Sequence, residues 1–180
     1  KKRSAEIARR LARRVRLLRR RVGVIEGPAP APQPINLRSF VAELAESVST
    51  EDGGGPRVHA ADVTASFAVP SAAVAVENLL RNAMEAARKL SNDAPDRVTL
   101  RAARTNESVT FLVCDRAGGI SPEFVREGLF RPFRTARAGG TGIGLYMARE
   151  IVRAAGGSLR MATAPGKGTV VRVRLPLAPR

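Results

Sequence analysis

The sequence predicts an α+β fold in which helices cover one face of a mixed, mostly antiparallel sheet, so that the domain is a two-layer α/β sandwich. Helical and strand-like segments interleave along the chain, but without the strand–helix–strand rhythm of a parallel sheet. Two strand pairs are each joined by a short turn, which is typical of antiparallel hairpins. The 180 residues, of which 44% are apolar, are enough to bury one core.

A helix with a narrow apolar seam is predicted for residues 4–26. From Ala8 to Ile25, apolar residues recur at alternating spacings of three and four, as in a coiled coil, and arginines occupy the other faces. Such a polar helix is not stable alone, and we expect it to pair with a helix of another chain. Alternating prolines then predict a semi-rigid linker over residues 27–35, followed by a domain over residues 36–180.

Hydrophobic periodicity and turn residues predict the elements of that domain in order. Helices are expected over residues 36–49, 71–90, 121–129 and 143–155, with Asn36 or Ser39 capping the first and Ser121 the third. Strands are expected over residues 57–60, 62–69, 97–104, 108–114, 158–163 and 169–176, and a loop over residues 131–141.

The formal charge of +15 is concentrated near the start of the chain. Residues 1–21 contain eleven Lys and Arg against one Glu, a net +10, so the other 159 residues carry +5. A solvated helix face is therefore favoured over contact with nucleic acid or anionic lipid. Aromatic residues make up only 4% of the chain, which argues against a stacking platform for single-stranded nucleic acid.

Other function classes are excluded by residues that the chain has few of. Cys114 and His59 are its only cysteine and histidine, so it has no disulfide framework and no histidine-rich metal site. No segment has the ~18–20 apolar residues of a membrane span, and no signal peptide is recognisable. We expect a cytoplasmic domain, and the sequence leaves open whether a parent protein is anchored in the inner membrane.

The first candidate for chemistry is an amide pair on the helix predicted for residues 71–90. Asn78 and Asn82 are four residues apart and share one face of that helix. Buried among apolar residues, these amides cost free energy unless they are satisfied, and an amide oxygen can bind Mg²⁺. Two exposed surface asparagines are the alternative interpretation.

Two further segments could build a ligand pocket. Asp115 ends an apolar strand and precedes small residues, where a carboxylate can accept a hydrogen bond from an adenine amino group; a plain Asx turn is the alternative. The glycines from Gly139 to Gly144 lead directly into a helix, whose N–H groups can hold phosphate. That segment is neither a Walker loop nor a dinucleotide fingerprint, and its alternative is a flexible surface loop.

Taken in order, these motifs resemble the ATP-binding catalytic domain of two-component sensor histidine kinases, within the superfamily of gyrase, MutL and heat-shock chaperones, whose nucleotide-binding domain is the Bergerat fold. Residues 78–83 are similar to the N box of that family and residues 115–119 to its G1 box. Residues 130–133 resemble the F box, residues 140–145 the G2 box, and residues 166–169 followed by 175–176 the last motif. The resemblance runs from about residue 36 to residue 176.

The resemblance implies an ATP site with Mg²⁺ as cofactor. It implies that Asn82 binds Mg²⁺, that Asn78 neighbours the phosphates, and that Asp115 holds the adenine amino group. Arg137 stands where the family often has a lid lysine near the γ-phosphate. The full set of ATP-site residues implied in this way is Asn78, Asn82, Glu85, Asp115, Gly119, Ile120, Phe133, Thr135, Arg137, Gly140, Thr141, Gly142, Gly144, Leu145 and Thr169.

The activity that the resemblance implies is protein-histidine kinase. In the hydrolysing relatives a glutamate at the position of Asn78 activates water, and an amide there is a poor base, which favours transfer to a protein acceptor. The γ-phosphate would pass to a histidine outside this chain and then to an aspartate of a response regulator. Residues 1–26 would be the end of a dimerisation helix that makes a homodimer, with the acceptor before residue 1. His59 is expected to be an ordinary surface or structural residue.

The sequence also departs from the family pattern. That pattern is Asp-x-Gly-x-Gly, and its first glycine is replaced by Ala117, which adds a Cβ where a positive φ or a close ligand approach is needed; Gly118 could take over the turn. A nucleotide-binding pseudokinase or regulatory module is therefore one alternative. An anti-sigma-type serine kinase is another, although the arginine-rich helix argues against it. Glu85 and residues 130–137 look most like the nitrogen-regulation subtype.

Overall fold

The computed structural model describes residues 30–49, 54–90, 97–135 and 141–178. The helix predicted for residues 4–26 and most of the predicted linker lie outside these ranges. Two residues of the expected ATP site, Arg137 and Gly140, also lie outside them.

Five strands form the main sheet, in the order β2-β4-β5-β7-β6. β2 runs parallel to β4, whereas β4–β5, β5–β7 and β6–β7 are antiparallel pairs. The strands are β2 (Arg57–Ala60), β4 (Val98–Arg104), β5 (Ser108–Asp115), β6 (Ser158–Ala164) and β7 (Gly168–Pro176). The prediction of a mixed, mostly antiparallel sheet is therefore confirmed.

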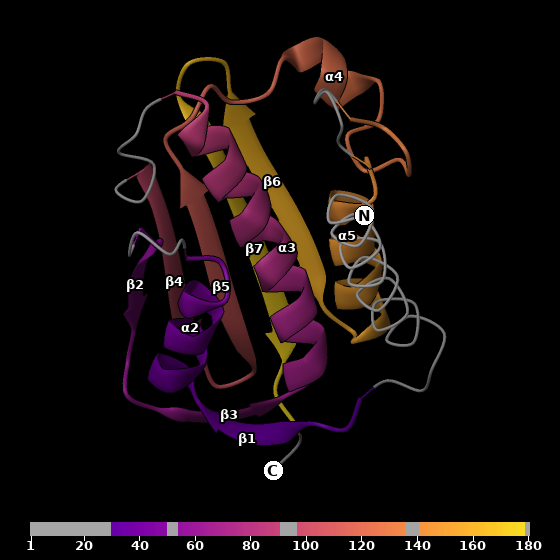
Figure 1. Ribbon diagram of the computed structural model, residues 1–180. Helices are drawn as coiled ribbons and strands as arrows, with labels where there is room; N and C mark the ends of the chain where they lie inside the picture. The colour runs from indigo at the N-terminus through magenta and orange to yellow at the C-terminus, as the bar shows by residue number, and fades with distance from the viewer. Residues whose placement is uncertain (1–29, 50–53, 91–96, 136–140, 179–180) are drawn as a thin grey trace, which may run out of the picture.

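Helices α2 (Leu37–Glu46), α3 (Val69–Arg88) and α5 (Gly144–Ala154) cover one face of this sheet, as Figure 1 shows. Alternate strand residues point toward these helices and are buried there. The rings of Phe40, Phe67 and Phe111 meet in this layer, with centroids 5.8 Å apart in each pair. The predicted two-layer α/β arrangement is thus confirmed, and its interior is a single apolar core.

A second, two-stranded sheet corrects the predicted linker. Strand β1 (Gln33–Asn36) pairs antiparallel with β3 (Thr64–Phe67), although residues 27–35 were predicted to be a linker. Pro34 is tolerated because β1 has only one neighbour, so the missing N–H need not cost a ladder bond. The end of the expected linker is therefore part of the folded domain.

The helix boundaries follow local capping chemistry. Of the two caps proposed for α2, Asn36 is the one used, since its Oδ1 accepts a hydrogen bond from the Ser39 N–H at 3.1 Å. α3 begins at Val69 instead of residue 71, because Pro70 is well suited to the first turn of a helix. No helix in the described ranges is long and apolar enough to cross a membrane.

The helix predicted for residues 121–129 is shorter than expected. Ser121 caps α4 (Pro122–Arg126) as predicted, with its Oγ accepting from the Phe124 N–H at 3.3 Å. The helix stops there because Gly128 has a φ of 108°, which helical backbone cannot adopt.

Candidate functional site

A pocket of about 1010 Å³ opens between α3, the end of β5 and the start of α5. Its size is at the upper end of the range typical of small-molecule sites. The expected ATP-site residues that line it are Asn78, Asn82, Glu85, Asp115, Gly119, Ile120, Thr135, Thr141, Gly142, Gly144, Leu145 and Thr169. Segments that are far apart in the sequence are therefore brought together as the motif order predicts.

The amide pair forms one wall of this pocket. Asn78 and Asn82 lie one turn apart on α3, and a Cβ built on Gly144 would be 3.8 Å from Asn82 Nδ2 and 4.0 Å from Asn78 Oδ1. The first turn of α5 is thus adjacent to both amides. Asn78 is only 4% exposed, so the alternative of two surface asparagines is wrong for this residue.

Asn78 carries an unmet hydrogen-bonding need. Its Nδ2 is buried and has no hydrogen-bond partner among the described residues. An unpaired buried donor costs about 1–3 kcal/mol, and such groups are rare in folded proteins. An anionic oxygen in the pocket would supply the missing acceptor, next to the N-terminus of α5, where the helix dipole favours negative charge.

Asp115 lies at the opposite end of the pocket, on a turn that is held by its own hydrogen bonds. Its Oδ1 accepts from the Ala117 N–H at 3.0 Å, so the Asx turn and the pocket position occur together. In the ladder Asp115 pairs with Thr169 of β7, which lines the same pocket. Asp115 Oδ2 is not the atom used by this turn, so the carboxylate can also serve a ligand.

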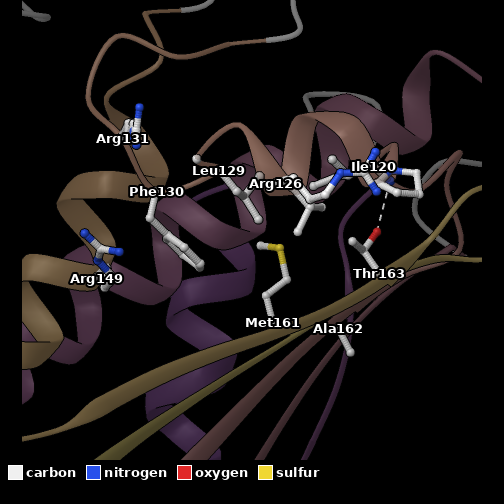
Figure 2. Close-up of a pocket in the computed structure, with 12 residues that line it drawn as sticks. Ile120, Arg126, Leu129, Phe130, Arg131, Arg149, Met161, Ala162 and Thr163 are labelled. Carbon is white, nitrogen blue, oxygen red and sulfur yellow. Dashed lines mark hydrogen bonds between the residues drawn. The ribbon is translucent and has the colours of Figure 1, made fainter.

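A threonine network ties this turn to the β6–β7 hairpin. Thr163 Oγ1 accepts from the Ile120 N–H at 3.0 Å, the bond drawn in Figure 2, and lies 3.1 Å from the Gly168 carbonyl. It is also 3.2 Å from Thr169 Oγ1. Sequence reasoning missed Thr163, because nothing in its local sequence distinguishes it from any other strand threonine.

The backbone at Ala117 answers the question raised by its missing glycine. Phe133 is the only non-glycine residue with a positive φ in the described part of the chain, so Ala117 has an ordinary conformation. The turn instead depends on Gly119, with a φ of 68°, where a Cβ would collide with the Ala164 carbonyl oxygen. Gly118 does not take over, since its φ is not positive. The substitution therefore introduces no backbone strain.

The glycine-rich segment is only partly as expected. Gly142 has a φ of 65°, and a Cβ there would be 2.5 Å from the Phe133 carbonyl carbon, so only glycine fits this close approach. Phe133, however, does not line the pocket: its side chain is 76% exposed. The reason is its left-handed backbone, with a φ of 63°, which directs it away from the core.

An apolar floor completes the pocket and was not predicted. Val113, Met161 and Val171 line it from three adjacent strands. Their alternation with exposed residues predicts a buried face but not a pocket floor. On the other side of the sheet, burial raises the pKa of the Cys114 thiol, which keeps the thiol protonated at neutral pH.

A second cavity of about 770 Å³ lies beside the first and shares Ile120, Leu129 and Met161 with it. Figure 2 shows Phe130 and Arg149 facing one another there, and the guanidinium carbon is 5.0 Å from the ring centroid. Phe130, which belongs to the motif similar to the F box, therefore supports the wall between the two cavities instead of lining the larger one.

The residues present fit a nucleotide with its metal. In the described residues no group of three or more His, Cys, Asp or Glu could hold a metal ion by itself. Mg²⁺ does not require such a group, because it commonly takes one or two protein oxygens together with waters and phosphates. His59 is exposed on β2 and does not line the pocket.

Comparison with known proteins decides the family. Residues 70–179 match the family described as the histidine kinase-, DNA gyrase B- and HSP90-like ATPases. The chain belongs to this family. Its match spans α3, the Asp115 turn, the glycine-rich segment and the β6–β7 hairpin, so the pocket is the ATP-binding site of a domain of this family.

Several curated relatives are sensor proteins. The C4-dicarboxylate transport sensor protein DctS of Rhodobacter capsulatus is 41% identical over 100 residues, which are 56% of this chain and 15% of that protein. The two-component sensor PprA of Pseudomonas aeruginosa is 42% identical over 105 residues, 56% of this chain and 11% of that protein. The nitrogen regulation protein NtrY of Azorhizobium caulinodans is 33% identical over 104 residues, 56% of this chain and 13% of that protein. The chain therefore spans only a small part of these relatives.

A solved structure supports the same fold. The mycobacterial sensor histidine kinase MprB superposes with a TM-score of 0.64, covering 83% of this chain and 99% of that chain, at 22% sequence identity. The identification of the chain with the histidine kinase ATPase domain is thus confirmed by both family and fold.

Proposed function

We propose that this chain is the ATP-binding catalytic domain of a sensor histidine kinase, which transfers the γ-phosphoryl group of Mg-ATP to a histidine outside the chain. The observation that carries the proposal is the buried Asn78–Asn82 pair beside the first turn of α5, with its unpaired donor. The sensor proteins among the relatives favour a histidine as acceptor. A response regulator would receive the phosphoryl group next.

Each end of the pocket has a separate task in this proposal. Asp115 and the threonines behind it hold the adenine, while Asn78 donates to a phosphate oxygen. Asn82 supplies an oxygen for Mg²⁺, which neutralises charge on the phosphates when bound. The site thereby orients the γ-phosphorus for in-line attack by an imidazole nitrogen.

The chemistry at Asn78 favours transfer over hydrolysis. During transfer the bond from the γ-phosphorus to its bridging oxygen breaks, ADP leaves, and a bond from phosphorus to nitrogen forms. An attacking water would need a base, and an amide cannot accept its proton. An acceptor imidazole enters with a free lone pair and needs no such base.

Two substitutions test the ATP site. Titration calorimetry with ATP should show Mg²⁺-dependent binding that Asn82→Ala and Asp115→Asn abolish, while Asn106→Ala, in the exposed β4–β5 turn, leaves it unchanged. Unaltered binding in both site variants would refute the proposal. A folded chain that gives no heat with ATP or ADP would instead favour a pseudokinase.

The acceptor is tested separately. With radiolabelled ATP and the histidine-bearing helical hairpin of DctS as acceptor, the chain should produce an acid-labile, alkali-stable phosphoprotein. Alkali-labile, acid-stable phosphate would indicate a serine and favour the anti-sigma-type alternative. Homodimerisation through residues 1–26 belongs to the same proposal and predicts a dimer in sedimentation experiments that deletion of those residues abolishes.

A further inference from the structure

The face of the main sheet that the helices do not cover carries an unusual set of charges. On this open face lie Arg57 of β2, Arg101 of β4, Arg160 of β6, and Arg172 and Arg174 of β7. Asp115 is the only acidic residue in the five strands, and it lines the ATP pocket on the opposite face. The open face is therefore positively charged without an internal counter-charge from the strands.

These arginines account for the excess charge of the domain. Residues 22–180 contain 20 Lys and Arg and 15 Asp and Glu. Five of those arginines, and none of the acidic residues, are on the open face, so the rest of this segment has 15 of each sign. The net charge that remains after the N-terminal segment is thus located on a single surface.

Three of the arginines form a row with an apolar residue between them. The ladder pairs Arg101 with Leu112, Leu112 with Arg172, and Arg172 with Arg160. None of these three guanidinium groups has an ion pair or hydrogen bond within the described ranges. Like charges directly opposite one another, as Arg160 and Arg172 are, destabilise a sheet. The fold tolerates this cost with no compensating contact among those residues.

The spacing of the row matches one side of an α-helix. Adjacent strands are about 4.8 Å apart, so the row places Arg, Leu, Arg and Arg at roughly 0, 5, 10 and 14 Å. Residues i, i+3, i+7 and i+10 of a helix lie at roughly 0, 4.5, 10.5 and 15 Å along its axis. A helix with acid, apolar, acid and acid at those positions would face the row with complementary groups.

We propose that the open face is a docking surface for an acidic amphipathic helix of a partner protein. The chain's own residues 1–21, with a net charge of +10, would be repelled, and so would the same face of a second copy. The face has no aromatic residue on which nucleic-acid bases could stack. Leu112 and the 42% exposed Val170 provide apolar contacts that a lipid headgroup layer would not use.

A designed peptide tests this surface with the complete chain. The probe is a helical peptide with Glu, Leu, Glu and Glu at i, i+3, i+7 and i+10, and its control has the same composition with these residues on different faces. Anisotropy should show binding of the probe that weakens at least tenfold in the variant Arg101→Gln/Arg160→Gln/Arg172→Gln. The matched variant Arg38→Gln/Arg126→Gln/Arg153→Gln, with the same change in net charge on exposed helix positions, should bind like the unaltered chain.

Each other outcome overturns the proposal. No binding of the probe, equal binding of the scrambled peptide, or equal loss in both variants would show that no specific helix site exists. Tighter, face-dependent binding to vesicles with 30% phosphatidylglycerol, or to duplex DNA, would assign the face to a different class of partner. Because the open face is separated from the ATP pocket by the sheet, ATP binding by the face variant confirms that it is folded.

Discussion

The two ends of the ATP pocket differ in how completely the protein satisfies its own polar groups. At the adenine end, the Asp115 carboxylate, Thr163 and the Ile120 N–H are joined in one hydrogen-bonded network. At the phosphate end, the buried Asn78 Nδ2 has no partner in the described structure. The first end is therefore organised before ATP binds, whereas the second is completed by the ligand.

This difference separates residues that support folding from residues that support binding. A substitution at the adenine end should lower stability and affinity together. A substitution at the phosphate end can lower affinity while leaving stability unchanged or higher, since unsatisfied functional groups cost stability. Four variants test this contrast, in order of decreasing expected effect.

Gly119→Ala should have the largest effect, because its Cβ would collide with the Ala164 carbonyl at a φ of 68°. We expect a loss of about 3 kcal/mol in the free energy of unfolding, with weaker ATP binding in the same protein. Urea denaturation measures the first and calorimetry the second. Gly118→Ala is the control, since a Cβ there has no neighbour within 4 Å. Similar losses in both variants would contradict the assigned role of Gly119.

Asn78→Leu should separate binding from stability. Removing the unpaired buried donor and filling its place with apolar atoms should raise the unfolding free energy of the unligated chain by about 1 kcal/mol. ATP affinity should fall at least tenfold, because an acceptor oxygen loses its donor. Thermal denaturation without and with Mg-ATP measures both. A less stable unligated variant would show that Asn78 is already satisfied.

Phe133→Gly should stabilise the phosphate end. A bulky residue with a φ of 63° is strained, and glycine adopts that conformation freely, so we expect a gain of about 1 kcal/mol over Phe133→Ala. The Ala variant is the appropriate reference because it keeps the Cβ and removes the exposed ring. Equal stability of the two variants would show that the backbone there is unstrained.

Ala117→Gly should have the smallest effect. Ala117 is 3% exposed and has an ordinary φ, so restoring the family glycine should cost only about 0.5–1 kcal/mol through the greater entropy of the unfolded chain. ATP affinity should change by less than about twofold, since no strain is relieved. A gain of tenfold or more in the calorimetric affinity would show instead that the Cβ obstructs the ligand.

Much of the site could be predicted because its chemistry is local. A four-residue spacing on an apolar helix places Asn78 and Asn82 together without reference to other elements. A carboxylate at a strand end and glycines before a helix are equally local patterns. The predicted residues Asp115 and Gly144 accordingly line the pocket.

The errors arose where distant segments decide the outcome. Gln33–Asn36 are a strand only because Thr64–Phe67 lie beside them, so the prolines indicated a linker. Phe133 is outside the pocket because Gly142 packs against its backbone. Thr163 is important because the turn at Ile120 reaches it across the hairpin.

The sequence by itself determined the helices, the strands, the motif order and the concentration of positive charge in residues 1–21, because these depend on periodicity and composition. Only the tertiary structure decided which glycine permits the Asp115 turn, which amide is left without a partner, and which arginines share the open face of the sheet. Those features depend on strand register and on contacts between segments far apart in the chain, and neither is encoded in any short stretch of residues.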